Sequence, residues 1–372
     1  MLVDFVVTDK SDRVVGGLKA QDFVVKEDGK ERPIVSFAAF SKASAAAPAA
    51  AEATVDEVPA ATPLTAGGVT TVLFVDDAQL KPQEAARLVP ALKKLVDVIA
   101  EQKGVLALVA PGSNIQLADE ASGNRAVYGA AIDRIVGHQL DDRSPYPVSD
   151  VEAILGEMGD TSIVERVAAR FVYLNRGLLK YDMALIAARG RITEVAAAAR
   201  ARRGYAYEVL LKSLDFLAGK PGRRSVVMVS GGYASDKDDV KQRELVNRSL
   251  QINAPIHFLD ARGLQGMSRY LGVEYRSAIE HDAIEPPGSF SEAAAGASGL
   301  ADDTGGLYVR NTNDMVKGLT RIVDMSGTYY ILGYEPPEHT KRGFRKIKVE
   351  VATKGLKVHS RRGYFDETAT PR

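Results

Sequence analysis

The sequence predicts a mixed α/β protein with a doubly wound, mostly parallel sheet, and three observations lead to this fold class. From Thr70 onward, apolar runs of five to eight residues alternate with stretches of helical periodicity, as in a parallel sheet covered on both faces. Hairpin patterns occupy the first 40 residues and strand patterns return after Gly327. A chain of 372 residues with 45% hydrophobic content is long enough for one large or two modest domains.

The two chain ends are expected to form one small β-sandwich module. Residues 1–40 contain apolar runs around polar turns, such as VDFVVTDKSDRVV, and residues 327–366 contain further strand patterns, such as FRKIKVEVA. Neither segment can bury its apolar face alone. We therefore expect residues near Val3 to Val7 to share a sheet or sandwich with residues near Phe344 to Val351.

A change of composition separates the first β-segment from the rest of the chain. Residues 41–68, from Ser41 to Gly68, are rich in Ala, Pro, Thr and Glu and poor in bulky apolar side chains. Such a stretch offers little burial to offset the entropy of ordering it. It predicts a flexible linker that is the most protease-sensitive part of the chain, with a domain boundary near Gly67.

Residues 69–326 are expected to form the α/β domain. The predicted strands are TTVLFVDD, GVLALVAPG, RSVVMVSGG, PIHFLDARG and GLYVRN. The predicted helices are Pro82 to Glu101, Arg125 to Val136, Tyr205 to Ala218, Asp238 to Ile252 and Asn313 to Asp324. A long loop is expected from Ile279 to Gly299. Ligand sites in this class of fold lie at the carboxyl ends of the strands.

One region departs from the alternation of strands and helices. Residues 148–203 have helical periodicity and a high alanine content, with no strand pattern among them. They predict a helical insertion between two strands of the sheet. Its last residues contain the basic stretch ARARR, which we interpret as a solvated helix face rather than a phosphate-binding patch.

Composition and charge narrow the possible partners. The 48 basic and 48 acidic residues cancel, so no overall field favours nucleic acid or an anionic membrane. The chain has no cysteine, which excludes a disulfide framework, a thiolate zinc site and a cysteine nucleophile. No apolar run approaches the length of a membrane-spanning helix, and the first residues resemble a strand more than a signal peptide. We expect neither nucleic-acid binding nor membrane insertion.

The motifs of common catalytic sites are absent from the sequence. Its five histidines are scattered without metal-binding spacing, and His257 inside the strand PIHFLD is interpreted as a packed residue. The glycine pairs in VSGGYASD and DDTGGLY fit tight turns better than phosphate cradles. We therefore expect the protein not to be an enzyme.

Six stretches follow one another along the chain: VDFVVTDKSDRVVGGLKAQDFVVKEDGKERPIVSF, LFVDD, PGRRSVVMVSGG, APIHFLDARGL, LADDTGGLYVRNTNDMVKGLTRI and the closing TYYILGYEPPEHTKRGFRKIKVEV with RRGY. In this order, over some 360 residues, they resemble bacterial, especially acidobacterial, von Willebrand factor type A-related proteins. The resemblance implies a von Willebrand A fold, which is Rossmann-like, flanked by a β-module. It also implies export to the periplasm or the cell exterior.

The resemblance would place a metal-ion-dependent adhesion site at the top of the sheet. Its usual first loop is Asp-x-Ser-x-Ser, and here Asp76 matches while Ala78 and Leu80 replace the serines. Tyr205 stands where the second loop usually has a threonine, and Gly231 stands where the third has an aspartate. Too few oxygen ligands remain for the octahedral demand of Mg²⁺, so the site is expected to be degenerate and the protein to hold no resident metal.

Other oxygen donors keep an alternative open. Asp77, Gln79 and Ser230 could each supply an oxygen, so a rebuilt Mg²⁺ or Mn²⁺ site that uses Asp76 and Asp77 is the alternative hypothesis. We prefer a simpler interpretation. Asp76 and Asp77 would face solvent at a strand-to-helix turn and complement the amino terminus of the following helix, where Pro82 suits the first turn.

These observations lead to a function hypothesis and two alternatives. The hypothesis is a non-enzymatic adhesion-type module whose top-face loops bind a protein partner. The residues that it assigns to this surface are Asp76, Asp77, Gln79, Tyr205, Ser230 and Gly231. The first alternative is a metal-dependent adhesion domain, and the second is a hydrolase of unrecognised type.

Overall fold

The structure, a computed structural model, describes residues 1–11, 13–40, 68–140, 144–233, 239–263, 289–337 and 343–366. The strands are β1 (Leu2–Thr8), β2 (Phe23–Glu27), β3 (Lys30–Arg32), β4 (Ile34–Phe40), β5 (Val69–Val75), β6 (Val105–Ala110), β7 (Ile115–Glu120), β8 (Arg223–Ser230), β9 (Ile256–Asp260), β10 (Tyr308–Val309), β11 (Tyr329–Tyr334), β12 (Gly343–Val351), β13 (Lys357–Ser360) and β14 (Gly363–Asp366). The helices are α1 (Pro82–Glu101), α2 (Arg125–Ile132), α3 (Asp150–Glu157), α4 (Thr161–Leu174), α5 (Tyr181–Ala218), α6 (Val240–Gln251), α8 (Ser289–Thr304) and α9 (Met315–Gly327). Except for Gly68, the predicted linker lies outside the described residues.

A six-stranded sheet forms the centre of the α/β part, in the order β10-β9-β8-β5-β6-β7. All its neighbours pair in parallel except β7, which is antiparallel to β6. The predicted mixed α/β fold with a mostly parallel sheet is confirmed. The sequence does not predict the edge strand β7. Only one of its residues, Ile115, is buried, so the alternation of apolar and polar side chains along this strand is weak.

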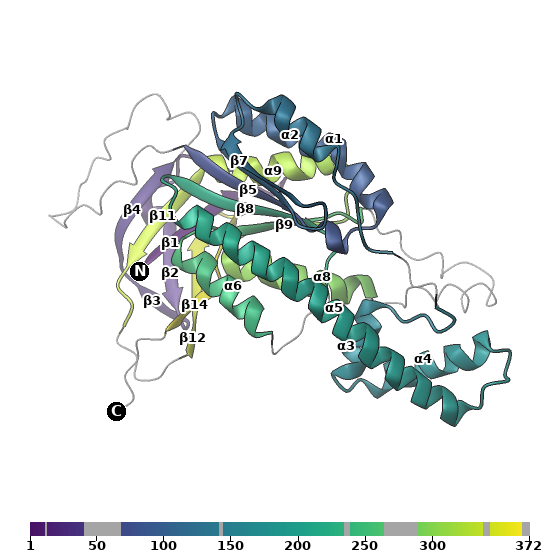
Figure 1. Cartoon of the computed structure of the whole chain (residues 1–372). Helices are drawn as coiled ribbons and strands as arrows, with labels where there is room; N and C mark the ends of the chain where they lie inside the picture. Colours follow the sequence, from purple (N-terminus) through teal and green to yellow (C-terminus); the bar gives the residue numbers. More distant parts are fainter. Residues whose placement is uncertain are drawn as a thin grey trace.

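Helices cover both faces of this sheet (Figure 1). On one face, Leu73 and Val75 of β5 pack with apolar side chains of α1, α2 and α9. On the other face, Val72 and Phe74 pack with α5, α6 and α8. Alternate residues of one strand thus enter two separate hydrophobic clusters, which explains why the last four residues of β5, Val72 to Val75, are all apolar.

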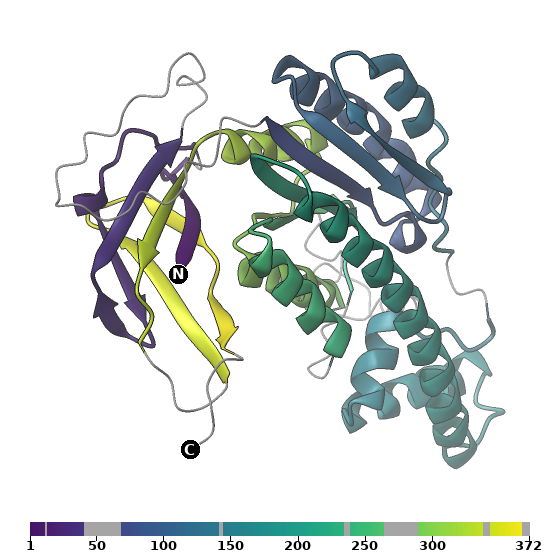
Figure 2. The ribbon, with the colours of Figure 1, turned by 60° about the vertical axis from the view of Figure 1, so that its left-hand side comes forward.

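The strands of the two chain ends form two four-stranded sheets, β13-β1-β11-β4 and β14-β12-β2-β3. Their inward side chains share one hydrophobic cluster, to which β1 contributes Val3, Phe5 and Val7 and β12 contributes Ile347 and Val349. Figure 2 shows these strands side by side, apart from the six-stranded sheet.

A buried ion pair joins the terminal strands to the α/β part. The Arg223 guanidinium at the start of β8 lies 2.6 Å from the Asp4 carboxylate of β1. The same guanidinium lies over the ring of Tyr329, 4.0 Å from its centre. The amino ends of the parallel strands therefore face the terminal sheets, and their carboxyl ends face away from them (Figure 1).

The helical insertion is present, but its predicted end is wrong. Helices α3 and α4 lie within residues 148–203, and α5 continues without a break from Tyr181 to Ala218. The predicted separate helix from Tyr205 is thus the second half of α5. A helix of this length spans about 57 Å at 1.5 Å per residue. It covers the sheet with one half and carries the insertion beyond the carboxyl ends of the strands with the other (Figures 1 and 2).

Other predicted bounds need smaller corrections. The helix predicted to reach Val136 ends at Ile132, and the helix predicted from Asn313 to Asp324 is α9, from Met315 to Gly327. The helix predicted from Asp238 to Ile252 is α6, which begins after its cap Asp239. The described part of the predicted loop at residues 279–299 is helical, because α8 begins at Ser289. Helix α1 has the predicted bounds.

No helix in the described ranges combines the length and the apolar character needed to cross a bilayer.

Candidate functional site at the carboxyl edge of the sheet

Five of the six residues predicted to form a site lie together at the carboxyl ends of β5 and β8. Asp76, Asp77 and Gln79 follow β5, Ser230 is the last residue of β8, and Gly231 follows it. The two aspartates do not face solvent, as the sequence led us to expect, since Asp76 is 1% exposed and Asp77 is fully buried. The reason is that the turn between β6 and β7 and the backbone after α2 both pack over them.

Asp77 holds a turn of the backbone in place. Its Oδ1 accepts the N–H of Gly112 at 2.7 Å, and its Oδ2 accepts the N–H of Ser113 at 2.6 Å. Both residues belong to the turn between β6 and β7. The backbone carbonyl of Asp77 also accepts the N–H of His138 at 2.8 Å. Both carboxylate oxygens are therefore used to join the loops after two neighbouring strands.

Asp76 is only half satisfied. Its Oδ2 accepts the hydroxyl of Ser230 at 2.9 Å, while its Oδ1 is buried without a hydrogen-bond partner. Burial is the main reason why the pKa of Asp76 rises from 3.8 to about 7. The hydrogen bond from Ser230 acts against this rise, and the negative charge of Asp77 adds to it. At neutral pH the Asp76 carboxyl is thus close to half protonated.

Backbone contacts close the site from above. A Cβ at Gly231 would lie 2.6 Å from the carbonyl oxygen of Gln79, so only glycine fits where β8 passes the turn after β5. The same holds for Gly112, where a Cβ would lie 2.9 Å from Asp77 Oδ1. Because the backbone at Gly231 and Gly112 packs so closely against the turn after β5, neither carboxylate is open to solvent.

The two aspartates do not cap the helix that follows them. Helix α1 begins at Pro82 with Lys81 as its cap residue, and the Glu84 carboxylate accepts the N–H of Lys81 at 2.9 Å. The capping role that we expected of Asp76 and Asp77 therefore belongs to Glu84. Between β5 and α1 the chain forms a short 3-10 helix over Asp77–Gln79.

Tyr205 is not part of this site. The sequence placed it in a loop at the start of a helix, but it lies in the middle of α5 and is 52% exposed. It lines a separate surface cleft between α5 and α6, together with Arg203 and Asp239. Arg203 and Asp239 form an ion pair at 3.0 Å, so the cleft is lined by charges that are already neutralised.

The donors at the site do not fit a Mg²⁺ ion. Both oxygens of Asp77 and one oxygen of Asp76 already accept hydrogen bonds, which leaves Asp76 Oδ1 as the carboxylate oxygen without a partner. An octahedral ion needs about six oxygens. The described residues contain no cluster of three or more His, Asp or Glu side chains arranged for a metal ion.

The described histidines near the sheet make structural contacts. His257 is buried on β9, as predicted, and its Nδ1 accepts the N–H of Leu307 at 3.0 Å. Burial, together with a smaller contribution from the positive charge of Arg223, lowers the pKa of His257 to about 3, so the ring is neutral. The His359 ring contacts the Thr8 hydroxyl at 3.0 Å, between two strands of a terminal sheet.

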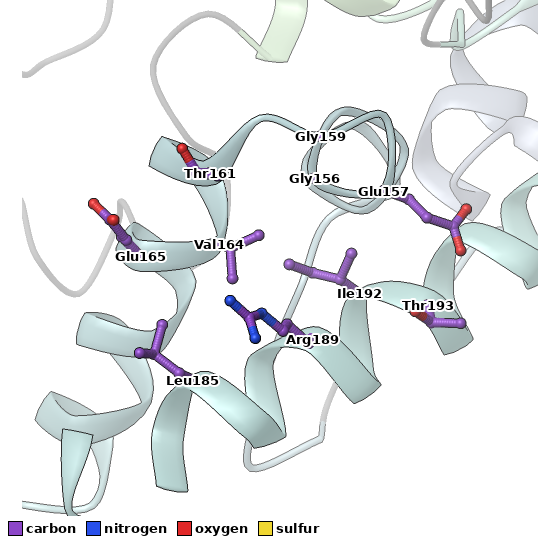
Figure 3. A pocket seen from close by; sticks show the side chains of 10 residues that line it. All are labelled: Gly156, Glu157, Gly159, Thr161, Val164, Glu165, Leu185, Arg189, Ile192 and Thr193. Carbon is purple, nitrogen blue, oxygen red and sulfur yellow. The ribbon is translucent and has the colours of Figure 1, made fainter. Parts of the chain in front are cut away.

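The helical insertion carries an open cleft of about 410 Å³ between α3, α4 and α5. We call it the insertion cleft. Val164, Leu185 and Ile192 supply apolar side chains to it, and the Arg189 guanidinium points toward Val164 (Figure 3). The carboxylate of Glu157 points away from Arg189 in the same view. It forms an ion pair with Arg200. The other lining residues are Gly156, Gly159, Thr161, Glu165 and Thr193.

Three other arginines of the insertion each form an ion pair with a carboxylate, whereas Arg189 forms none with any described residue. Arg170 pairs with the buried Glu152, Arg200 with Glu157, and Arg202 with Asp150. Arg189 has no hydrogen bond or ion pair with any residue that the structure describes, and it is exposed. In the insertion cleft the Arg189 guanidinium thus lies beside apolar side chains without a hydrogen bond or ion pair to a described residue, although Glu157 and Glu165 also line the cleft.

Exposed apolar side chains gather at the far end of the insertion. Leu178, in the turn between α4 and α5, is 88% exposed. The first turns of α5 add Tyr181 at 46%, Met183 at 55% and Ile186 at 64%. We call these four residues the insertion tip. Single exposed apolar residues are ordinary, but several on one short segment are typical of an interaction surface.

Comparison with protein-family models finds no match to this chain, and comparison with curated proteins finds no similar sequence. The residues of the site must therefore be judged from the structure. Sequence reasoning missed Gly112 and Ser113, although they follow the apolar run of β6 and so lie at the same edge of the sheet as Asp77. It also missed Arg189, because nothing in the sequence tells a paired arginine from an unpaired one.

Proposed function

We propose that the chain is a non-enzymatic protein-binding module, with a von Willebrand A-like α/β domain and a β-sandwich of terminal strands that positions it. The observation that carries this proposal is the exposure of the insertion tip, on a segment that stands out from the body at the carboxyl edge of the sheet. Burying four such side chains would contribute several kcal/mol to binding, at about 25 cal/mol per Å² of apolar surface. The resemblance to exported proteins supports a place outside the cytoplasm.

The insertion cleft supports the same proposal and indicates the partner's chemistry. Val164, Leu185 and Ile192 suit an apolar side chain, and the unpaired Arg189 suits a carboxylate next to it. The partner would thus present an apolar residue beside Asp, Glu or a chain terminus. In this proposal the binding surface is the insertion rather than the buried residues Asp76 and Asp77.

Photo-cross-linking tests the proposal. A photoreactive amino acid at Leu178 should capture a defined protein from an extract of the source organism, whereas the same group at Val127 on α2, which is 53% exposed, should not. Arg189→Ala should reduce capture at Leu178, and Arg134→Ala, at an exposed site outside the insertion, should leave it unchanged. Equal capture from the two positions would refute the proposal.

One observation favours the metal-dependent alternative. Asp76 Oδ1 is a buried carboxylate oxygen without a partner, which a cation could fill if the surrounding loops moved. In that case Mg²⁺ or Mn²⁺ would raise the melting temperature of the wild type but not that of Asp76→Ala. A captured partner would then be lost in EDTA.

A further inference from the structure

The segment that carries the insertion tip has an excess of positive charge. Residues 173–189 contain three basic residues, Arg176, Lys180 and Arg189, and one acidic residue, Asp182. The chain as a whole is balanced, with 48 basic and 48 acidic residues. We call Arg176, Lys180 and Arg189 the tip cations. Asp182 lies in the first turn of α5, where the helix dipole stabilises a carboxylate.

The tip cations are exposed and carry charge that the described part of the chain does not balance. None of the three forms a side-chain hydrogen bond or an ion pair with any residue that the structure describes. Other basic side chains of the insertion are paired: Arg170 with Glu152, Arg191 with Glu194, Arg200 with Glu157, and Arg202 with Asp150. The positive charge that is left over is therefore concentrated around the insertion tip.

The tip cations lie among the exposed apolar side chains of the insertion tip. Arg176 lies two residues before Leu178, in the turn between α4 and α5, and Lys180 is the cap residue of α5. Arg189 follows Ile186 by three residues on α5, and residues at this spacing are neighbours on a helix surface. Apolar and positively charged side chains are thus interspersed over one projecting surface (Figure 2).

The insertion cleft continues this surface, because Leu185 and Arg189 of α5 line its wall. Two carboxylates also line the cleft. Glu157 is paired with Arg200, and the carboxylate of Glu165 points away from Arg189 (Figure 3). A flat lipid surface could cover the projecting tip but could not fill a concave cleft, whereas the side chains of a polypeptide can do both. The cleft therefore favours a polypeptide over a membrane as the occupant.

We propose that the insertion tip and the insertion cleft together bind an acidic, amphipathic polypeptide segment. Its apolar side chains cover the tip and enter the cleft, and its carboxylates lie beside the tip cations. Burial of the apolar side chains supplies most of the affinity, while the opposite charges supply specificity and speed association. The inference rests on the proposed function, because it names the chemistry of the partner that the same surface binds.

Fluorescence anisotropy with three labelled synthetic peptides of equal length tests the chemistry of the partner. The first peptide carries leucine and glutamate at helical spacing, the second has lysine in place of each glutamate, and the third has serine in place of each leucine. The full chain should bind the first peptide about tenfold more tightly than either of the others. Raising the NaCl concentration from about 50 mM to about 500 mM should weaken this binding, because salt screens exposed charges.

Charge reversal at the tip tests which residues are responsible. Arg176→Glu with Lys180→Glu changes two exposed side chains and adds acidic groups at the start of α5, where they suit the helix dipole, so the variant should fold. It should bind the acidic peptide about tenfold more weakly than the wild type and should prefer the basic peptide. The matched control is Lys94→Glu with Arg134→Glu, at exposed positions outside the insertion, and it should bind as the wild type does.

Equal affinity for the acidic and basic peptides, or an unchanged preference in the reversed variant, would overturn the proposal. So would tighter binding to phosphatidylglycerol vesicles than to the acidic peptide, which would make the partner a lipid surface. If no peptide binds while a photoreactive group at Leu178 still captures a protein, the acidic segment is refuted and the proposed function stands. If neither binding nor capture occurs, both fail.

Discussion

Replacing Asp76 by asparagine should remove a pH-dependent loss of stability. Asparagine keeps the shape of the side chain and can still accept the hydroxyl of Ser230, but it cannot ionise. In the wild type, folding raises the pKa of Asp76 from 3.8 to about 7, mainly through burial. The substitution therefore isolates the free energy of burying this one carboxyl in its charged form.

The sign and the size of this pH-dependent change in stability follow from proton linkage. Because the folded state binds the Asp76 proton more tightly than the unfolded state, the contribution of this group to stability is fully present below about pH 4. It is lost as the pH rises to about 7, where the folded state also releases the proton. The full loss is about 4 kcal/mol, of which about 3 kcal/mol falls between pH 5 and pH 8.

Urea unfolding at pH 5 and pH 8 measures the effect, followed by circular dichroism because the chain has no tryptophan. Asp76→Asn should gain about 3 kcal/mol relative to the wild type on going from pH 5 to pH 8. Amide exchange in β5 and β8 should show the same change locally, which matters because a chain with separate cores can unfold in steps.

Ser230→Ala is the matched variant. It removes the hydrogen bond that favours the charged form of Asp76, so the pKa of Asp76 should rise further and its titration by carbon NMR should move to higher pH. A stability difference between wild type and Asp76→Asn that is the same at pH 5 and pH 8 would refute the reasoning. It would mean that a cation or water stabilises the charged carboxylate in the fold.

Four further predictions concern the packing around the site, the insertion core and the response to a metal ion. Gly231→Ala should cost about 1–3 kcal/mol, because its Cβ would lie 2.6 Å from the carbonyl oxygen of Gln79. Gly129→Ala in α2, where nothing lies within 4 Å of the added Cβ, should be neutral or stabilise by up to about 1 kcal/mol in thermal melts. Glu152→Gln should cost about 3–5 kcal/mol by leaving the buried Arg170 without its counter-charge. In the Glu152→Gln variant, amide exchange should become faster in α3 and α4 but not in the six-stranded sheet, which would show that the loss of stability is confined to the insertion. An equal increase in exchange rate in both regions would count against a separate insertion core. The wild type should melt at the same temperature in EDTA and in millimolar Mg²⁺, since an ion at 100 times its Kd would add about 2.7 kcal/mol.

The sequence predicted the central sheet because its strands are buried on both faces. The apolar runs that became β5, β8 and β9 are nearly continuous, and such runs between helical stretches have few other interpretations. The antiparallel strand β7 escaped prediction because it lies at an edge and buries little. The sequence prediction divides helix α5 in two, because it treats residues 148–203 as one unit. The helical pattern in fact continues through Gly204, where a Cβ would meet no backbone, so that glycine marks no break.

The environment of the candidate site could not be predicted from local sequence. Asp76 and Asp77 stand at a strand end, which is ordinarily a solvent-exposed position. Their burial depends on Gly112 and Ser113, some 35 residues away along the chain, whose N–H groups bind the Asp77 carboxylate. Periodicity describes which side chains face a core but not which loops meet above a sheet. The same limit hid the unpaired Arg189, which only the packing of three helices reveals.

The measurement that tests the central claim most directly is photo-cross-linking from Leu178, performed in EDTA and again in millimolar Mg²⁺. The claim is that the insertion, and not the carboxylates after β5, forms the binding surface. It predicts capture of the same protein in both conditions, with unchanged yield in Asp76→Asn and a reduced yield in Arg189→Ala. Capture that requires Mg²⁺ and disappears in Asp76→Asn would contradict the account and place the binding site at the carboxyl edge of the sheet.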